Sequence, residues 1–413
     1  MTSDAATAGE HPWSGPGPRE FIFLMAALMA ANALAIDAML PALPAIGRSL
    51  DVSFDNQRQL VVTVFLIGAG AGQLIYGPVS DRLGRKPVLI TGLCLYIIFA
   101  VLAGLAGSFP LLLVARTLQG VAAASSRVLA VSIIRDRFHG ANMARIMSFT
   151  TIVFMFIPLI APSLGQLVLA IASWRAIFLL LALFSIAVLL WIIIRLPETL
   201  PPERRRPLSP GHIYEAVKLI LSNPLSIGNT LAMMTLLGAM FGFINSVQQI
   251  MFDVFHEPQM LGLVFAGIAG GMSVAAYLNT RIIHRFGARR IMLVALWVFV
   301  FLTIAHLAIS HAVGEILWVF CIFQAMCMAC VGLISSNLAS IAMQPLGHVA
   351  GTASSVQGMI TTLGGALIGF AIGQHFDGTT IPFDTAFVIC GVISLLLALW
   401  ANRPRISASA VNA

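Results

Sequence analysis

One acidic residue interrupts the first apolar stretch of the chain. Between Phe21 and Ile46 the only charged residue is Asp37, within the sequence AIDAMLPALP. A carboxylate in membrane hydrocarbon costs roughly 2.5–3.5 kcal/mol on insertion scales, and a low dielectric favours its protonated form. Asp37 is therefore predicted to load and release a proton near physiological pH. A static pair with an arginine is the alternative interpretation.

Two arginines lie inside another apolar stretch, LLLVARTLQGVAAASSRVLAV at 111–131. Arg116 and Arg127 are 11 residues apart, so in a helix they share one face and lie about 16 Å apart along the axis. A buried arginine needs a partner or a wet cavity. Arg116 is too deep to reach the membrane surface and is predicted to face Asp37 or a substrate. Arg127 either does the same or extends its long side chain to the surface.

The chain that must position these residues has the composition of a polytopic membrane protein. Of its 413 residues 59% are hydrophobic and 9% are charged, whereas soluble proteins average roughly 25% charged residues. Its apolar runs of about 20 residues suit spanning helices and not the alternating strands of an outer-membrane barrel. We therefore predict an all-α membrane protein with twelve transmembrane helices, over residues 20–46, 57–79, 88–107, 109–134, 142–172, 175–196, 224–251, 258–283, 289–311, 313–344, 349–375 and 382–402.

The longest polar interruption, PETLPPERRRPLSPGHIYEAVK at 197–218, contains five prolines and a basic run. We expect a solvated cytoplasmic linker, part of which forms a helix at the membrane surface. It separates two six-helix bundles. The predicted domains are a cytoplasmic tail (1–19), an N-terminal bundle (20–196), the linker (197–223), a C-terminal bundle (224–403) and a second cytoplasmic tail (404–413).

A weak internal repeat supports this division. SDRLGRKPVLI at 80–90 aligns with IHRFGARRIML at 283–293 at an offset of 203 residues, which pairs Gly84 with Gly287. Two parallel, pseudo-symmetric six-helix halves around a central cavity are a plan found in secondary transporters.

The positions of the basic residues predict the orientation. Of 23 lysines and arginines, 18 fall in loops on one side of the membrane and three on the other. Because basic loops stay in the cytoplasm, both termini are expected on the cytoplasmic side of the inner membrane. The net charge of +7 follows from this bias, so no nucleic-acid partner is expected.

The loop GPVSDRLGRKP at 77–87 is the most specific local signal. Its first glycine allows close helix contact, its second permits a turn with positive φ, and its acid lies at a helix end beside basic anchors. An ordinary basic loop is the alternative interpretation. The candidate residues are Gly77, Asp81, Arg82, Gly84, Arg85 and Lys86.

This loop resembles the G-x-x-x-D-R-x-G-R-K loop of the major facilitator superfamily, and the twelve-helix layout extends the resemblance over nearly the whole chain. In that family the loop is a conformational latch, whose Asp pairs with basic residues and helix ends to stabilise the outward-facing state. The resemblance implies this role for the six residues above. In the second copy His284 stands where the Asp would be and Ala288 replaces an Arg, so we expect a weaker or absent latch there.

The sequence ARTLQG is similar to the R-x-x-Q-G motif of helix 4 in drug–proton antiporters of this superfamily. The resemblance implies a role in proton coupling, carried over to Arg116, Gln119 and Gly120.

The segment FMFIPLIAPSLGQLV at 154–168 resembles the Gly/Pro motif of helix 5 that marks the antiporter branch. The matching residues are Pro158, Pro162 and Gly165. Prolines bend a helix by removing backbone hydrogen bonds. Ala161 and Gln166 depart from the motif, so the match is only supporting evidence.

The segment IDAMLPALP is similar to helix 1 of the Bcr/CflA multidrug efflux family, which includes exporters of bicyclomycin and phenicols. In such relatives an acid of helix 1 serves proton and drug coupling, which the resemblance implies for Asp37.

The C-terminal half is interpreted as having no intramembrane Asp, Glu, Lys or Arg, which makes Asp37 the only intramembrane carboxylate. Its polar candidates are neutral, and nearby Met and Phe side chains can repack around varied ligands. His306 is interpreted as a structural hydrogen-bonding residue in preference to a proton relay. The predicted substrate-binding residues are Asp37, Arg116, Gln119, Arg127, Met240, Asn245, Gln324 and Asn337.

These features predict a proton-driven exporter of drug-like small molecules that works by alternating access, as a monomer in membrane lipid. A facilitator, importer or exporter of an endogenous metabolite with the same fold is the alternative. The sequence has no HExxH, GxSxG or P-loop motif, so no enzymatic activity and no cofactor are expected. Cys327 and Cys330 have CxxC spacing, but no further ligands accompany them and no metal site is predicted.

Overall fold

The computed structural model describes residues 15–205 and 210–403. Most of the predicted first tail and the whole of the predicted second tail, 404–413, lie outside the described residues. Twelve helical segments in the described chain are long and apolar enough to cross a membrane. No strand occurs among the described residues. The predicted all-α fold with twelve membrane helices is confirmed.

The first half of the chain forms a bundle of long helices joined by short turns. Its helices are α1 (Pro18–Asp37), α2 (Leu43–Ser49), α3 (Leu60–Leu83), α4 (Arg85–Gly104), α5 (Phe109–Arg137), α6 (Gly140–Ile171) and α7 (Arg175–Arg195). Short 3-10 turns lie between α1 and α2 (η1, Leu40–Ala42), between α2 and α3 (η2, Asp55–Gln59) and after α7 (η3, Pro202–Arg204).

The second half begins with a helix inside the predicted linker and continues as a second bundle. Its helices are α8 (Pro210–Ser222), α9 (Pro224–Gln249), α10 (Leu261–Phe286), α11 (Ala288–Val313), α12 (Leu317–Met343), α13 (Ala350–Gln374) and α14 (Ile381–Ala401). Shorter turns lie at η4 (Ile250–Val254, a π turn), η5 (Pro258–Met260) and η6 (Gln344–Val349). Part of the linker is therefore helical, as expected.

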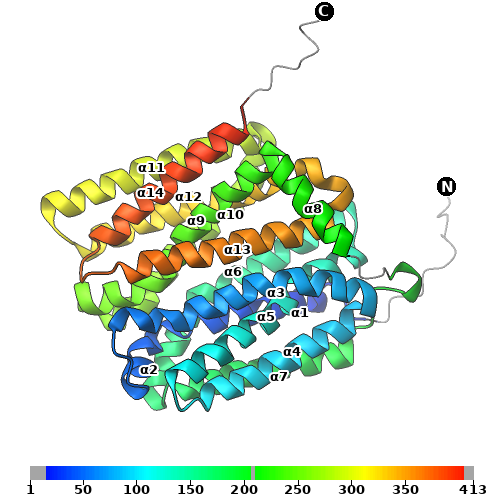
Figure 1. Ribbon diagram of the computed structural model, residues 1–413, viewed down its shortest axis with the longest axis horizontal. Coiled ribbons are helices and arrows are strands. Elements are labelled where there is room, and N and C mark those ends of the chain that lie inside the picture. Colours follow the sequence, from blue (N-terminus) through cyan, green and yellow to red (C-terminus); the bar gives the residue numbers. More distant parts are fainter. Residues whose placement is uncertain (1–14, 206–209, 404–413) are drawn as a thin grey trace, which may run out of the picture.

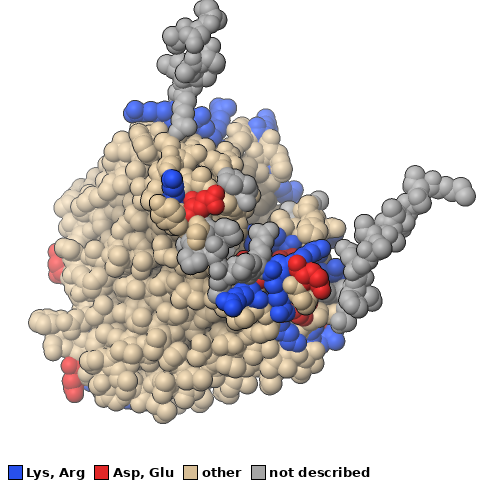
Figure 2. Space-filling view, turned by 45° about the vertical axis from the view of Figure 1, so that its right-hand side comes forward, with Lys and Arg blue, Asp and Glu red and all other residues tan. Residues whose placement is uncertain are grey.

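The two bundles lie side by side, with their long helices running in roughly the same direction (Figure 1). They meet where α3 packs on α13 and where α6 packs on α10. Both chain ends leave the same end of the molecule, which we call the terminal end; the opposite end is the far end. Lysine and arginine side chains gather around the terminal end, whereas the broad face beside it carries few charges (Figure 2).

The break in the first membrane span has a simple cause. Pro41 has no backbone N–H to donate to the carbonyl of Asp37, one turn earlier. Helix α1 therefore ends at Asp37, and the chain continues through η1 into α2. The aspartate lies at the end of a helix and not within a continuous one.

The internal repeat appears as two matching turns at the terminal end. Gly84 joins α3 to α4 with φ 103°, and Gly287 joins α10 to α11 with φ 77°. Both angles favour glycine. The two turns occupy equivalent places in the two bundles, as the alignment of the repeat predicts.

Candidate functional site

Asp37 is buried at the end of α1, with 5% of its surface exposed. Within the described part of the chain its carboxylate has neither a hydrogen bond nor an ion pair. Nearby, on the same helix, Asn32 Nδ2 donates to the carbonyl of Ala123 on α5 at 3.0 Å. An acid buried without a compensating partner is costly when charged. Asp37 is thus suited to binding a proton or a cationic group.

Arg116 is completely buried on α5 and connects three helices. Its Nε donates to the carbonyl of Val61 at 3.0 Å, and its Nη2 donates to the carbonyl of Ala35 at 3.0 Å. Its Nη1 donates to Gln119 Oε1 at 2.9 Å. No ion pair with Asp37 is found among the described residues. Arg116 instead holds the backbone of α1 two residues before the acid.

Arg127 is exposed, although it lies about 15 Å along α5 from the last residue of that helix. On the same helix Leu111 and Leu118 have exposed side chains that point out of the bundle. Nine residues separate Leu118 from Arg127, which places the two on opposite sides of the helix, about 180° apart. The exposed side chain of Arg127 therefore points toward the interior of the molecule, and this favours the site interpretation over extension to the membrane surface.

The four predicted amide residues share one property. Each is buried and has one amide atom without a hydrogen-bond partner among the described residues. A buried polar group left unpaired costs about 1–3 kcal/mol, so these atoms favour a ligand that can hydrogen-bond to them. The atoms are Gln119 Nε2, Asn245 Oδ1, Gln324 Nε2 and Asn337 Oδ1.

The remaining contacts of these candidates differ between residues. Asn245 Nδ2 donates across the bundle interface to Thr63 Oγ1 at 3.4 Å, and Asn337 Nδ2 donates to Asn279 Oδ1 at 2.9 Å. Met240 is half-buried on α9 and packs against the large apolar core. Apart from the Arg116–Gln119 bond, no hydrogen bond within the described chain joins one predicted substrate residue to another.

A second intramembrane acid was missed. Asp384 lies in the first turn of α14, inside the last membrane span, and only 2% of its surface is exposed. His306 Nδ1 on α11 lies 3.0 Å from its Oδ1, and the hydroxyls of Ser310 and Thr380 donate to its Oδ2 at 3.1 and 3.3 Å. The His306 ring also stacks on Phe323. The expectation that the C-terminal half has no charged residue inside its spans was wrong.

Amide side chains connect the two bundles at the far end, in a group that we call the far-end amide cluster: Asn56, Gln59, Gln249 and Gln374. Asn56 donates to the carbonyls of Gln374 and Phe376 at 3.1 and 2.9 Å, and Gln374 donates back to the carbonyl of Asn56 at 2.8 Å. Gln249 donates to Asn56 Oδ1 at 2.8 Å, and Gln59 donates to Gln249 Oε1. No functional role was predicted for these four residues.

A charged network surrounds the first repeat turn at the terminal end. Arg85 lies 2.6 Å from Asp81 and 2.8 Å from Asp136, and it also donates to Ser80 Oγ at 2.6 Å. The backbone N–H groups of Arg85 and Lys86 donate to the carboxylate of Glu198 at 2.9 and 3.1 Å. Glu198 thus caps the start of α4, a position that favours an acid.

The sequence matches the profile of the Major Facilitator Superfamily over residues 25–369 and 241–412. The chain belongs to this superfamily. It is 30% identical over 392 residues to an uncharacterized MFS-type transporter, YdgK, of Bacillus subtilis strain 168, with 93% of this chain and 96% of the relative covered.

Two further relatives have names that refer to drug resistance. A bicyclomycin resistance protein homolog of Haemophilus influenzae is 28% identical, with 91% of this chain and 94% of the relative covered. The multidrug resistance protein MdtL of Escherichia coli is 27% identical, with 93% and 96% covered.

In this major facilitator protein the six predicted latch residues have different surroundings. Asp81 and Arg85 form an ion pair within the N-terminal bundle, and Arg82 is exposed. A Cβ at Gly77 would lie 3.1 Å from Ser355 Oγ on α13, so this glycine allows close contact between the bundles. The partners Asp136 and Glu198 were not predicted. Asp136 lies between two arginines in the last turn of α5, and Glu198 follows the last residue of α7, Arg195, by three positions.

The predicted helix 5 motif lies in α6, which contains both Pro158 and Pro162. A Cβ at Gly165 would come within 2.9 Å of Pro41 Cγ, so this glycine lets α6 approach the break after α1. Gln166, which departs from the superfamily motif, donates to the carbonyl of Pro258 in the other bundle at 2.8 Å.

Proposed function

We propose that this major facilitator protein is a proton-coupled exporter of drug-like small molecules, of bicyclomycin or phenicol type, in the bacterial inner membrane. The drug-resistance names of two relatives that cover nearly the whole chain support the substrate class. The gathering of basic side chains at the terminal end supports cytoplasmic termini. The observation that carries proton coupling is the buried carboxylate of Asp37, which has no partner in the described chain.

The coupling cycle uses one carboxyl group for two ligands. When the site faces the periplasm, Asp37 takes a proton and the compound leaves. When the site faces the cytoplasm, the proton leaves and the charged carboxylate favours a new compound. Arg116 holds the carbonyl of Ala35, so it fixes the position of Asp37 and contributes positive potential close to it.

The conformation supports alternating access with the periplasmic side closed. Two hydrogen bonds join the bundles away from the far end in the described chain. One runs from Asn245 to Thr63, and the other, from Gln73 to Thr362 at 3.0 Å, lies nearer the terminal end. The others are those of the far-end amide cluster and of Gln166. Each contributes about 0.5–1.5 kcal/mol net, so proton and substrate binding can supply enough free energy to open this end.

The unpaired amide atoms support a substrate with several donors and acceptors and no fixed charge. They lie on α5, α9 and α12, so a compound between the bundles can bind to both. Met240 supplies an adaptable apolar surface beside them. The exposed guanidinium of Arg127 would bind an electronegative group of the compound.

The test is uptake of radiolabelled chloramphenicol into inverted membrane vesicles under an imposed pH gradient. We expect the wild type to accumulate the compound against its concentration gradient and Asp37→Asn to lose this accumulation. Asp377→Asn, at an exposed far-end turn, is the matched control and should be unchanged. Full accumulation by Asp37→Asn would refute the coupling role. Equilibration without accumulation by the wild type would indicate a facilitator.

A further inference from the structure

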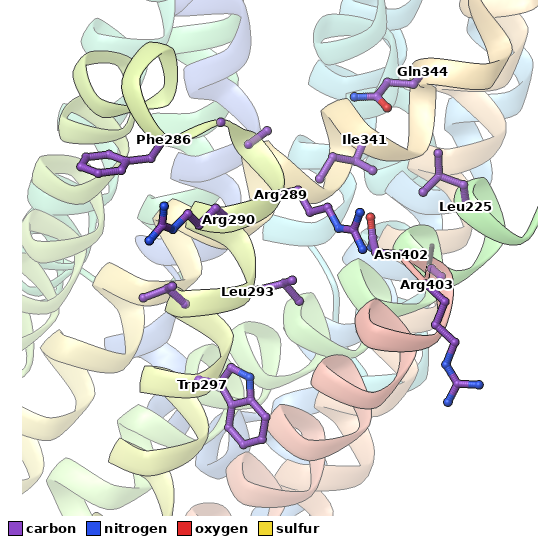
Figure 3. Close-up of a pocket in the computed structure, with 14 residues that line it drawn as sticks. Leu225, Phe286, Arg289, Arg290, Leu293, Trp297, Ile341, Gln344, Asn402 and Arg403 are labelled. Atoms are coloured by element: carbon purple, nitrogen blue, oxygen red, sulfur yellow. The ribbon is translucent and has the colours of Figure 1, made fainter. Parts of the chain in front are cut away.

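A basic hollow opens at the terminal end of the C-terminal bundle, away from the candidate transport site. It has a volume of about 1010 Å³ and is lined by the terminal-end portions of α9, α11, α12 and α14. Figure 3 shows Arg289 extending toward Asn402 and Arg290 extending the opposite way, toward Phe286. Arg403 lines the same hollow from the end of α14. Three arginines thus line one space.

The charge of this hollow is unbalanced. None of its lining residues is acidic. Arg289, Arg290 and Arg403 are exposed, and no ion pair or hydrogen bond joins their guanidinium groups to another residue within the described ranges. Figure 3 shows the guanidinium groups of these three residues pointing apart, as like charges do when no anion lies between them.

The repeat shows what kind of group belongs at this position. In the N-terminal bundle the carboxylate of Glu198 accepts the N–H groups of Arg85 and Lys86 at the start of α4. In the C-terminal bundle the equivalent helix, α11, starts at Ala288, and no side chain among the described residues accepts a hydrogen bond from the N–H groups of Ala288 or Arg289. The chain that returns beside it after α14 supplies Asn402 and Arg403 and no acid. An external anion can therefore take the place that Glu198 takes in the first bundle.

A smaller apolar hollow adjoins the basic one. It has a volume of about 360 Å³, and Arg290 is the only charged residue among those that line it. Phe286, Arg290 and Val294 line both hollows. Val294 and Trp297, which follow the first residue of α11 by six and nine positions, are each 57% exposed, so the hollows continue along the outer face of this membrane helix. A charged hollow therefore continues into an apolar one at the edge of the membrane.

We propose that an anionic phospholipid of the adjacent leaflet binds here, with its phosphate in the basic hollow and one acyl chain in the apolar hollow. Arg289 and Arg403 hold the phosphate, and Arg290 lies where headgroup and acyl chain meet. The combination of charge and apolar groove selects a lipid over a free anion, because a free anion uses only the basic hollow. This site is independent of the transported compound and of proton coupling.

The experiment is native mass spectrometry of the purified full-length chain titrated with phosphatidylglycerol or with phosphatidylcholine of the same acyl chains. The wild type should bind phosphatidylglycerol at least tenfold more tightly. Since each arginine near a lipid surface contributes about a fivefold change in affinity, the double variant Arg289→Gln/Arg403→Gln should weaken phosphatidylglycerol binding about 25-fold. Arg281→Gln removes another exposed arginine, which bonds to Tyr277 and does not line the hollow, and should bind as the wild type does.

A second variant separates the two parts of the site. Leu333 lines only the apolar hollow, so Leu333→Trp should weaken phosphatidylglycerol binding and leave binding of inorganic phosphate unchanged. Equal binding of the two lipids by the wild type, or unchanged phosphatidylglycerol binding by the double arginine variant, would overturn the proposal. Inorganic phosphate that binds as tightly as phosphatidylglycerol would also overturn it, in favour of a free-anion site.

Discussion

Among the residues that the structure describes, each bundle buries one carboxylate inside a membrane-spanning helix, and the two acids have opposite surroundings. Asp384 is held by His306, Ser310 and Thr380, whereas Asp37 has no partner in the described chain. A carboxylate with several partners is stabilised in one state, and a change in its charge disrupts the whole group. A carboxylate without partners can change its charge and leave its neighbours in place. This difference supports our proposal that Asp37 binds and releases the proton, whereas Asp384 holds its bundle together.

The largest expected effect separates the two acids by function. Asp37→Asn should reduce gradient-driven accumulation at least tenfold, to the level of vesicles without the protein, because Asn cannot carry a proton. Asp384→Asn keeps the shape and most hydrogen bonds of the second acid, so accumulation should stay within about threefold of the wild type. Both are measured in inverted vesicles at matched protein levels. A folded Asp384→Asn variant that is equally uncoupled would remove the distinction.

The next effect is the loss of stability when each of the two acids is removed. Asp384→Ala leaves His306, Ser310 and Thr380 without their shared partner, which should lower the free energy of unfolding by about 3 kcal/mol. Asp37→Ala removes an unpaired acid and should change it by less than about 1 kcal/mol. Denaturant unfolding of the purified proteins in one detergent gives both values. Equal losses of stability would mean that Asp37 has partners of comparable strength.

A smaller effect concerns the arginine that positions Asp37. Arg116→Lys keeps the charge but cannot reproduce the three hydrogen bonds of the guanidinium to Val61, Ala35 and Gln119. We expect a stability loss of about 2 kcal/mol and accumulation reduced about fivefold, with the direction of transport retained. The same vesicle and unfolding assays measure both. Wild-type accumulation in this variant would show that Asp37 works without help from Arg116.

The smallest effect tests whether opening of the far end exposes Asp37 but not Asp384 to a reagent. Gln59→Ala removes a donor to Gln249 and to the carbonyl of Gly373, which should favour opening of the far end by about 1 kcal/mol, or about fivefold. Labelling of carboxyl groups with a hydrophobic carbodiimide, followed by peptide mass spectrometry, should show Asp37 reacting about fivefold faster. Asp384 lies inside its own bundle and should react at an unchanged rate. Parallel increases at both acids would indicate general loosening of the fold.

Much of the architecture follows from the sequence, because it depends on local patterns. Apolar runs of spanning length predict the twelve membrane helices, and the alignment of Gly84 with Gly287 predicts two equivalent turns with positive φ. Pro41 and Pro44 mark the break after α1. Each of these features is determined by residues within one or two turns of one another.

The partners within the site could not be predicted in the same way. Asp136 and Glu198 are 51 and 113 residues from Arg85 along the chain, and His306 lies on a different helix from Asp384. Only helix packing brings these groups together. Asp384 was overlooked because it lies in the first turn of its helix, where an acid is common and resembles part of a loop. The alternative interpretation, a static pair of Asp37 with an arginine, is not what Arg116 forms, because its guanidinium bonds to backbone carbonyls instead.

The contacts that close the far end are made by amides and backbone carbonyls, with no ion pair among the bonds of the far-end amide cluster. Amide groups neither gain nor lose protons in water near neutral pH, and their hydrogen bonds are little affected by dissolved salt. This closure therefore keeps the same strength in acidic, neutral, dilute or saline surroundings. With the far end on the periplasmic side, as we propose, changes in the pH or salt of the medium leave the strength of this closure unchanged.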